Sequence, residues 1–148
     1  MTREAALFDL DGTLCDTSQI EHLVTGPDAD YRAFHAASAD APTRADVHAA
    51  LDEARGRGLA IVLWTGREFL WRDLTLDWLD RHGIAQDGLY MRLAADYRPA
   101  AVVKTELLRD ISSDGLTVVE AWEDDREIVD LLRSAGVPDV RQVAGGAS

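Results

Sequence analysis

The feature that most limits the fold is a regular alternation of short apolar runs with amphipathic segments. The clearest run, at residues 59–64, reads Leu-Ala-Ile-Val-Leu-Trp and ends at a polar Thr-Gly-Arg sequence. Runs of this kind are typical of strands buried on both faces of a sheet. The alternation predicts an α/β fold, in which a parallel sheet of about five strands carries helices on both faces.

The same pattern predicts the order of elements. Strands are expected at residues 5–8, 59–64, 89–91, 116–121 and 140–143. Helices are expected at 28–37, from Thr43 as N-cap to Gly56 or Gly58, at 68–82, from Pro99 to Leu108, and after residue 125 as far as Gly136. Residues 12–27 read as a loop, and Tyr31, Phe34 and Val102 are expected to pack inward. We expect one domain over residues 1–144 and a frayed tail at 145–148.

Composition favours a soluble chain with one core. Of 148 residues 47% are apolar, and Cys15 is the only cysteine, which excludes a disulfide framework. The sequence shows neither a signal peptide nor a membrane span, so we expect a cytoplasmic protein without a membrane partner. The formal net charge of −12 repels phosphate backbones at long range, so any nucleic-acid contact must be local. The oligomeric state stays open.

Three polar clusters follow predicted strands. Asp9 and Asp11 follow the first strand, Thr65-Gly-Arg67 follows the second, and Asp124 and Asp125 follow the fourth. These positions share the carboxyl edge of a parallel sheet, where open α/β folds bind ligands. Up to four carboxylates in one place repel each other, so the cluster requires a cation, and an all-oxygen set suits Mg²⁺. Taken singly, each cluster could also be a turn or a helix cap.

Four segments match, in order, the four motifs of the haloacid dehalogenase (HAD) superfamily of phosphohydrolases. They are Phe8-Asp-Leu-Asp-Gly-Thr-Leu14, Leu63-Trp-Thr-Gly-Arg67, Lys104 and Glu123-Asp-Asp-Arg126. The resemblance spans nearly the whole chain. It implies a Rossmann-like sheet and Mg²⁺-dependent phosphoryl transfer through an aspartyl phosphate.

The resemblance also implies a role for each motif residue. Asp9 is the nucleophile, and Asp11 protonates the leaving oxygen and then activates water. Thr65 and Lys104, the only lysine of the chain, bind the phosphoryl group. The implied metal ligands are Asp9, the backbone carbonyl of Asp11, and Asp124 or Asp125.

The second half of the chain resembles a narrower group, the 3′-phosphatase domain of bacteriophage-type polynucleotide kinase-phosphatases. The resemblance rests on Tyr90-Met-Arg-Leu-Ala-Ala-Asp-Tyr-Arg-Pro99 and Val102-Val-Lys-Thr-Glu106. It implies that Gly66 and Arg67, then Arg92 and Arg98, contact the substrate phosphate. An arginine expected after the first motif is replaced by Ile20, so either His22 or Arg32 substitutes for it or end recognition differs.

The segments between the motifs are too short for a large cap domain, so the site is expected to be open to a large substrate. We therefore expect a phosphatase that removes 3′-phosphates from DNA or RNA ends. The alternatives are a small-molecule or nucleotide phosphatase, a phospho-accepting signalling domain, and a subunit that partners a separate kinase. The last is considered because the chain lacks a Gly-x-x-x-x-Gly-Lys-Ser/Thr loop of its own.

Overall fold

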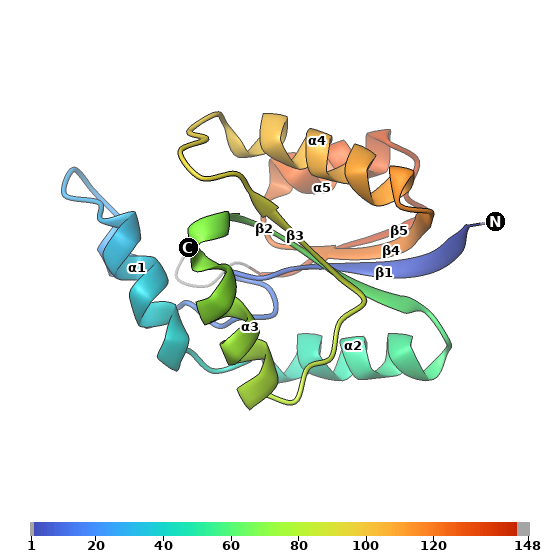
Figure 1. The fold of residues 1–148 in the computed structure, drawn as a ribbon, viewed down its shortest axis with the longest axis horizontal. Helices are drawn as coiled ribbons and strands as arrows, with labels where there is room; N and C mark the ends of the chain where they lie inside the picture. The colour runs from blue at the N-terminus through green and yellow to red at the C-terminus, as the bar shows by residue number, and fades with distance from the viewer. Residues whose placement is uncertain (1, 145–148) are drawn as a thin grey trace.

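A five-stranded parallel sheet forms the centre of the molecule, in a computed structural model that describes residues 2–144. The strand order is β3-β2-β1-β4-β5, which confirms the expected α/β fold (Figure 1). The strands are β1 (Arg3–Asp9), β2 (Ala60–Glu68), β3 (Gly88–Arg92), β4 (Leu116–Glu123) and β5 (Asp139–Gln142). Strand β1 is thus flanked by β2 and β4, which each carry one of the other motifs.

Helices cover both faces of the sheet. On one face lie α2 (Ala45–Gly56) and α3 (Arg72–Arg81), and on the other lie α4 (Ala100–Ser113) and α5 (Arg126–Ser134), as Figure 1 shows. Helix α1 (Tyr31–Ala37) lies beyond the end of the sheet and is preceded by the 3₁₀ turn η1 (Glu21–Val24). Two further 3₁₀ turns are η2 (Ser38–Asp40) and η3 (Phe69–Trp71).

Alternate residues of β1 enter two separate cores because successive strand side chains point to opposite faces. Ala6 and Phe8 pack in the core beneath α2 and α3, whereas Ala5 and Leu7 pack beneath α4 and α5. All of these side chains are fully buried. The sequence therefore reads as a continuous apolar run up to Asp9, the last residue of the strand.

Several local predictions are wrong in detail. Thr43 does not cap α2, because it pairs with Cys15 in a β-bridge and the helix begins two residues later, with Arg44 at the N-cap. Tyr31 and Val102 are not packed inward; they are 63% and 42% exposed. The predicted helix at 68–82 is divided into η3 and α3, and the predicted loop at 12–27 contains η1. The tail at 145–148 lies outside the described residues.

The segments between the motifs add no large cap. Residues between Asp11 and Thr65 form η1, α1, η2 and α2, and those between Arg67 and Lys104 form η3, α3 and β3. The expectation of an uncapped site is therefore confirmed. Among the described helices, none combines the length and the apolar character that crossing a bilayer requires.

Candidate active site

The motif residues meet at the carboxyl edge of the sheet. Asp9 ends β1, Thr65 lies in β2 beside it, and Glu123 ends β4 on the other side. They line an open cleft of about 1030 Å³. Adjacent parallel strands place their final side chains together, which is why residues far apart in sequence converge here.

Lys104 joins the carboxylates of β1 and β4. Its ammonium group, on α4, donates to Asp9 Oδ1 at 3.0 Å and to Glu123 Oε1 at 2.6 Å. It also lies 4.7 Å from the ring centroid of Trp64. Burial alone would lower the pKa of Lys104, but the two carboxylates outweigh that effect and raise it. The lysine is therefore held as a cation beside Asp9.

Glu123 is a site residue whose separate role the sequence analysis missed. Its side chain is fully buried, and Oε2 accepts the backbone N–H groups of Asp124 and Asp125 at 3.0 and 3.2 Å. Burial and the nearby Asp9 raise its pKa. Glu123 thus fixes both Lys104 and the loop after β4. Its position at the end of a buried strand, next to two aspartates, was the available signal.

Asp124 faces Asp9 across the cleft. The Thr13 hydroxyl lies between them, 3.3 Å from Asp9 Oδ2 and 3.4 Å from Asp124 Oδ1. Burial and the Asp9 charge raise the pKa of Asp124 to about 7. Gly12, at φ +81°, leaves the space that Asp124 occupies, since a Cβ there would overlap Asp124 Oδ2.

Oxygen atoms from Asp9, Glu123 and Asp124 lie within 4.8 Å of one another. Because Glu123 already binds Lys104 and two backbone N–H groups, Asp9 and Asp124 are the pair left facing the cleft. A crowded all-oxygen set of this kind fits Mg²⁺. Asp125 lies outside this group: it is exposed, and its side chain accepts the N–H of Glu127 at 2.9 Å as the N-cap of α5.

Asp11 is paired with Arg67. The guanidinium donates to both carboxylate oxygens, at 3.0 Å from Nε and 2.6 Å from the terminal nitrogen. The other terminal nitrogen donates to Thr75 Oγ1 at 2.9 Å, and Arg67 is only 1% exposed. Burial raises the pKa of Asp11, but the charge and hydrogen bonds of Arg67, together with the charges of His35 and Lys104, lower it overall. The donors of Arg67 therefore point at Asp11 and Thr75.

Thr65 and Gly66 lie toward the carboxyl end of β2 and line the cleft. The Thr65 hydroxyl accepts the N–H of Arg67 at 3.1 Å, and residues 2–144 offer no acceptor for its own proton. That proton can therefore be donated to a substrate oxygen. The Gly66 carbonyl accepts a hydrogen bond from the Nε–H group of Arg92 at 2.8 Å.

Arg92 and Arg98 also line the cleft, but most of their donors hold the loop between β3 and α4. Arg92 donates to the carbonyls of Asp96 and Arg98 at 2.9 and 2.7 Å. Its other terminal nitrogen lies beside Gly66, 3.6 Å from where a Cβ would stand. Arg98 pairs with Asp96 and Glu106. Arg92 therefore keeps one donor for a ligand, whereas the charge of Arg98 is neutralised.

Ile20 stands where the resemblance leads us to expect an arginine, and the two candidate substitutes for that arginine, His22 and Arg32, differ in position. Arg32 lines the cleft, whereas Ile20 and His22 lie outside its lining. Within the described part of the chain, Arg32 makes no ion pair and no side-chain hydrogen bond. Of the two substitutes suggested by the sequence, Arg32 is the one placed at the cleft.

Solved structures share this fold. Two chains from the Pnkp1/Rnl/Hen1 RNA repair complex are 26% and 29% identical, with TM-scores of 0.83 and 0.79. They are matched over 99% and 96% of this chain but only 44% and 46% of their own, so this chain spans less than half their length. The class C acid phosphatase of Bacillus anthracis shares the fold at 15% identity, with a TM-score of 0.73 over 100% of this chain and 69% of that one.

The family comparison covers almost the whole chain. No match was found among the curated proteins. The family model described as "Polynucleotide kinase PNKP phosphatase domain" matches residues 3–147. The chain is therefore a phosphatase of the HAD superfamily and belongs to the family of PNKP phosphatase domains.

Proposed function

We propose that this protein is a Mg²⁺-dependent phosphomonoesterase that removes 3′-phosphates from polynucleotide ends through a phosphorylated Asp9. One observation carries the proposal: Lys104 binds Asp9 Oδ1 and Glu123 while Asp124 faces the same aspartate. This arrangement holds a carboxylate nucleophile beside one fixed cation and one carboxylate partner for a metal. Enzymes place such groups where negative charge must be stabilised during phosphoryl transfer.

In the first step a carboxylate oxygen of Asp9 forms a bond to phosphorus, and the bond from phosphorus to the leaving oxygen breaks. Asp11 gives that oxygen its proton. In the second step Asp11 takes a proton from water, the water oxygen attacks phosphorus, and the bond to Asp9 breaks. Inorganic phosphate is released. In both steps the ammonium group of Lys104 and the hydroxyl group of Thr65 donate hydrogen bonds to phosphoryl oxygens.

The pairing with Arg67 suits the second step, because it favours the ionised Asp11 that accepts a proton. For the first step Asp11 must enter as the acid. Arg67 thus acts as a positioning residue, which sets the orientation and the charge of Asp11, and we assign direct phosphate binding to the free donor of Arg92.

The metal would be held by Asp9, Asp124 and the backbone carbonyl of Asp11, which accepts no hydrogen bond within residues 2–144. Bound there, Mg²⁺ would offset the negative charge of the carboxylates and of the incoming phosphate. Asp125 is not included among these ligands, because its side chain caps the N-terminus of α5.

A polynucleotide end is supported as the substrate by three features. The cleft is open and uncapped, the free donor of Arg92 and the unpaired Arg32 line it, and the chain resembles proteins of an RNA repair complex. Because those proteins come from a complex of several proteins, we also propose a kinase partner for this chain. Co-purification of a polynucleotide kinase with the tagged protein would test the partner.

A substrate panel tests the function. The purified protein is assayed for phosphate release from DNA and RNA 3′-phosphates, the matching 5′-phosphates and free nucleotides, each with Mg²⁺ and with EDTA. We expect the oligonucleotide 3′-phosphates to react fastest and only with Mg²⁺. A preference for free nucleotides of more than tenfold would instead establish the small-molecule alternative.

A further inference from the structure

Tyr97 is an exposed aromatic side chain at the rim of the catalytic cleft. It is 85% exposed and lines the same cleft as Asp9. Within residues 2–144 its side chain makes no hydrogen bond and no ring contact. The phenol ring contributes nothing to the core of the described fold, and its place on the cleft leaves it available to a ligand.

The loop that carries Tyr97 is firmly held. Arg92 donates to the carbonyls on both sides of it, those of Asp96 and Arg98. Arg98 in turn forms ion pairs with Asp96 and with Glu106 of α4. The backbone on both sides of Tyr97 is therefore held beside the cleft.

The backbone conformation of this loop also indicates that the loop is held in place. Ala95 has φ +61°, a left-handed conformation that residues with a Cβ avoid. Arg92 also donates Nε to the carbonyl of Gly66, next to Thr65. One side chain thus connects the loop of Tyr97 to the end of β2 that faces the phosphate.

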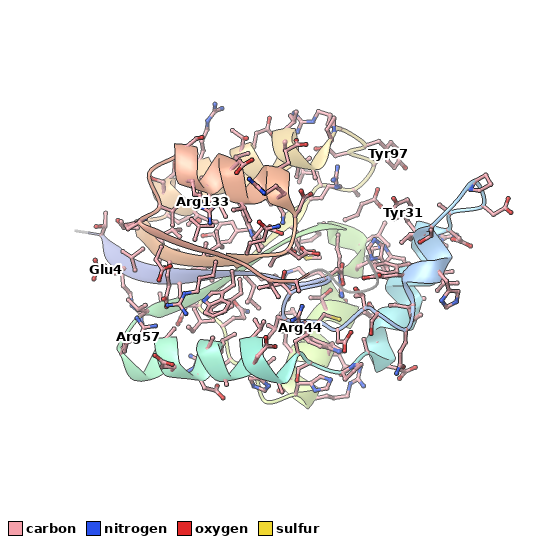
Figure 2. All side chains as sticks on the ribbon, turned by 180° about the vertical axis from the view of Figure 1, so that it is seen from behind. Glu4, Tyr31, Arg44, Arg57, Tyr97 and Arg133 are labelled. Atoms are coloured by element: carbon pink, nitrogen blue, oxygen red, sulfur yellow. The ribbon has the colours of Figure 1, made fainter. Side chains whose placement is uncertain are left out.

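Aromatic side chains from other elements line the same cleft. Tyr31 is 63% exposed at the start of α1, and its ring lies 6.5 Å from that of His35, which lies 5.7 Å from Trp71. All of these residues line the cleft, and Figure 2 shows Tyr31 and Tyr97 at the same end of the molecule. The cleft therefore offers ring faces on its rim and phosphate-binding groups at its floor.

We propose that Tyr97 stacks on the 3′-terminal nucleobase of the substrate whose phosphate is held at Asp9. The inference rests on the proposed function and deepens it by naming a residue that selects nucleotides. Base–aromatic stacking tolerates every base, because every base has a π face. The enzyme should therefore distinguish a terminal nucleotide from an abasic end but hardly distinguish one base from another.

The test compares two oligonucleotide 3′-phosphates that differ only in the terminal residue, which is either a normal nucleotide or an abasic analogue. Tyr97→Ala should lower kcat/KM on the normal substrate by roughly 5- to 100-fold. On the abasic substrate it should stay within about twofold of wild type, because stacking is the only contact removed. Tyr97→Phe keeps the ring and should behave as wild type.

Leu93→Ala is the matched control, because Leu93 lies in the same loop and is 69% exposed but does not line the cleft. It should leave both substrates unaffected. Binding gives a second readout: 2-aminopurine at the 3′-phosphorylated terminus, bound to the Asp9→Asn protein, should lose fluorescence on stacking. Adding Tyr97→Ala should restore that fluorescence.

Equal losses on the normal and abasic substrates would assign Tyr97 a merely structural role and overturn the inference. No loss on either substrate would also overturn it, while leaving the phosphatase function intact. Failure of the wild-type protein on every oligonucleotide 3′-phosphate would overturn the proposed function, and this inference with it.

Discussion

The guanidinium of Arg67 holds both carboxylate oxygens of Asp11 in a buried, two-point ion pair. The Asp11 side chain is 22% exposed and that of Arg67 only 1%, so the charge of the arginine is almost completely removed from water. The proposed acid–base residue therefore has a preset orientation, and the pair lowers its pKa. This pairing connects the second motif to the first.

Arg67→Met should destabilise the protein because it leaves Asp11 and Thr75 without a donor. Breaking a buried pair costs about 3–5 kcal/mol of unfolding free energy, measured by urea titration. The control is Arg81→Met, which breaks an exposed pair with Asp77 and an exposed hydrogen bond to the Ala39 carbonyl and should cost about 1 kcal/mol or less. Similar losses in the two variants would contradict the buried role of Arg67.

Lys104→Arg should lower kcat sharply, by about 100-fold or more. The buried space between Asp9 and Glu123 accommodates a compact ammonium group, whereas a planar guanidinium cannot reach the same two oxygens and a phosphoryl oxygen together. Lys104→Met should in addition lose about 3–5 kcal/mol of stability, because two buried carboxylates lose their cation. Near-normal turnover of the Lys104→Arg enzyme would count against the assigned role.

Gly12→Ala should weaken Mg²⁺ binding, because the new Cβ takes the place of Asp124 Oδ2. Gly58→Ala is the matched control: Gly58 has φ +86°, close to the +81° of Gly12, but a Cβ there meets no atom within 4 Å. Both variants should lose about 1–2 kcal/mol from backbone strain. Only Gly12→Ala should need more Mg²⁺ for half-maximal activity, so an equal Mg²⁺ requirement would contradict the close contact.

The metal-free protein should lose stability as the pH rises from about 4 to about 7. Burial and Asp9 raise the folded-state pKa of Asp124 to about 7, so the folded protein retains a proton that the unfolded chain has already released. The stabilisation is complete below the unfolded pKa and disappears as the pH passes the folded pKa.

Urea unfolding at a series of pH values in EDTA measures this effect. Asp124→Asn should remove that part of the pH dependence, and Mg²⁺ should reduce it in the wild-type protein, since a cation stabilises the ionised carboxylate. The same pH slope in wild-type and Asp124→Asn proteins would exclude Asp124 as the source.

Much of the fold could be predicted because its signals are local. Buried strands such as 59–64 are recognisable as apolar runs, and the polar residues that end them mark one edge of a parallel sheet. The displacement of the α2 N-cap from Thr43 to Arg44 could not be foreseen, since the pairing of Thr43 with Cys15 depends on how the preceding loop folds back.

The site was harder to predict wherever a partner is a backbone atom or a distant side chain. Arg92 binds three carbonyls whose positions depend on the loop path, and Arg67 meets Asp11 only through the pairing of two strands. Tyr31 resembled a core residue by its helical spacing, yet it faces the cleft. Whether an aromatic side chain is exposed depends on which elements pack around it, and the spacing of apolar residues in the sequence does not show that.

The most direct test of the central claim, that Asp9 is the Mg²⁺-dependent phosphate acceptor, measures phosphate release from an oligonucleotide 3′-phosphate by wild-type and Asp9→Asn proteins. With Mg²⁺ the wild-type enzyme should release phosphate, and Asp9→Asn should be slower by about a thousandfold or more, because the amide cannot attack phosphorus. Wild-type rates from Asp9→Asn, or equal wild-type rates in Mg²⁺ and EDTA, would contradict the account.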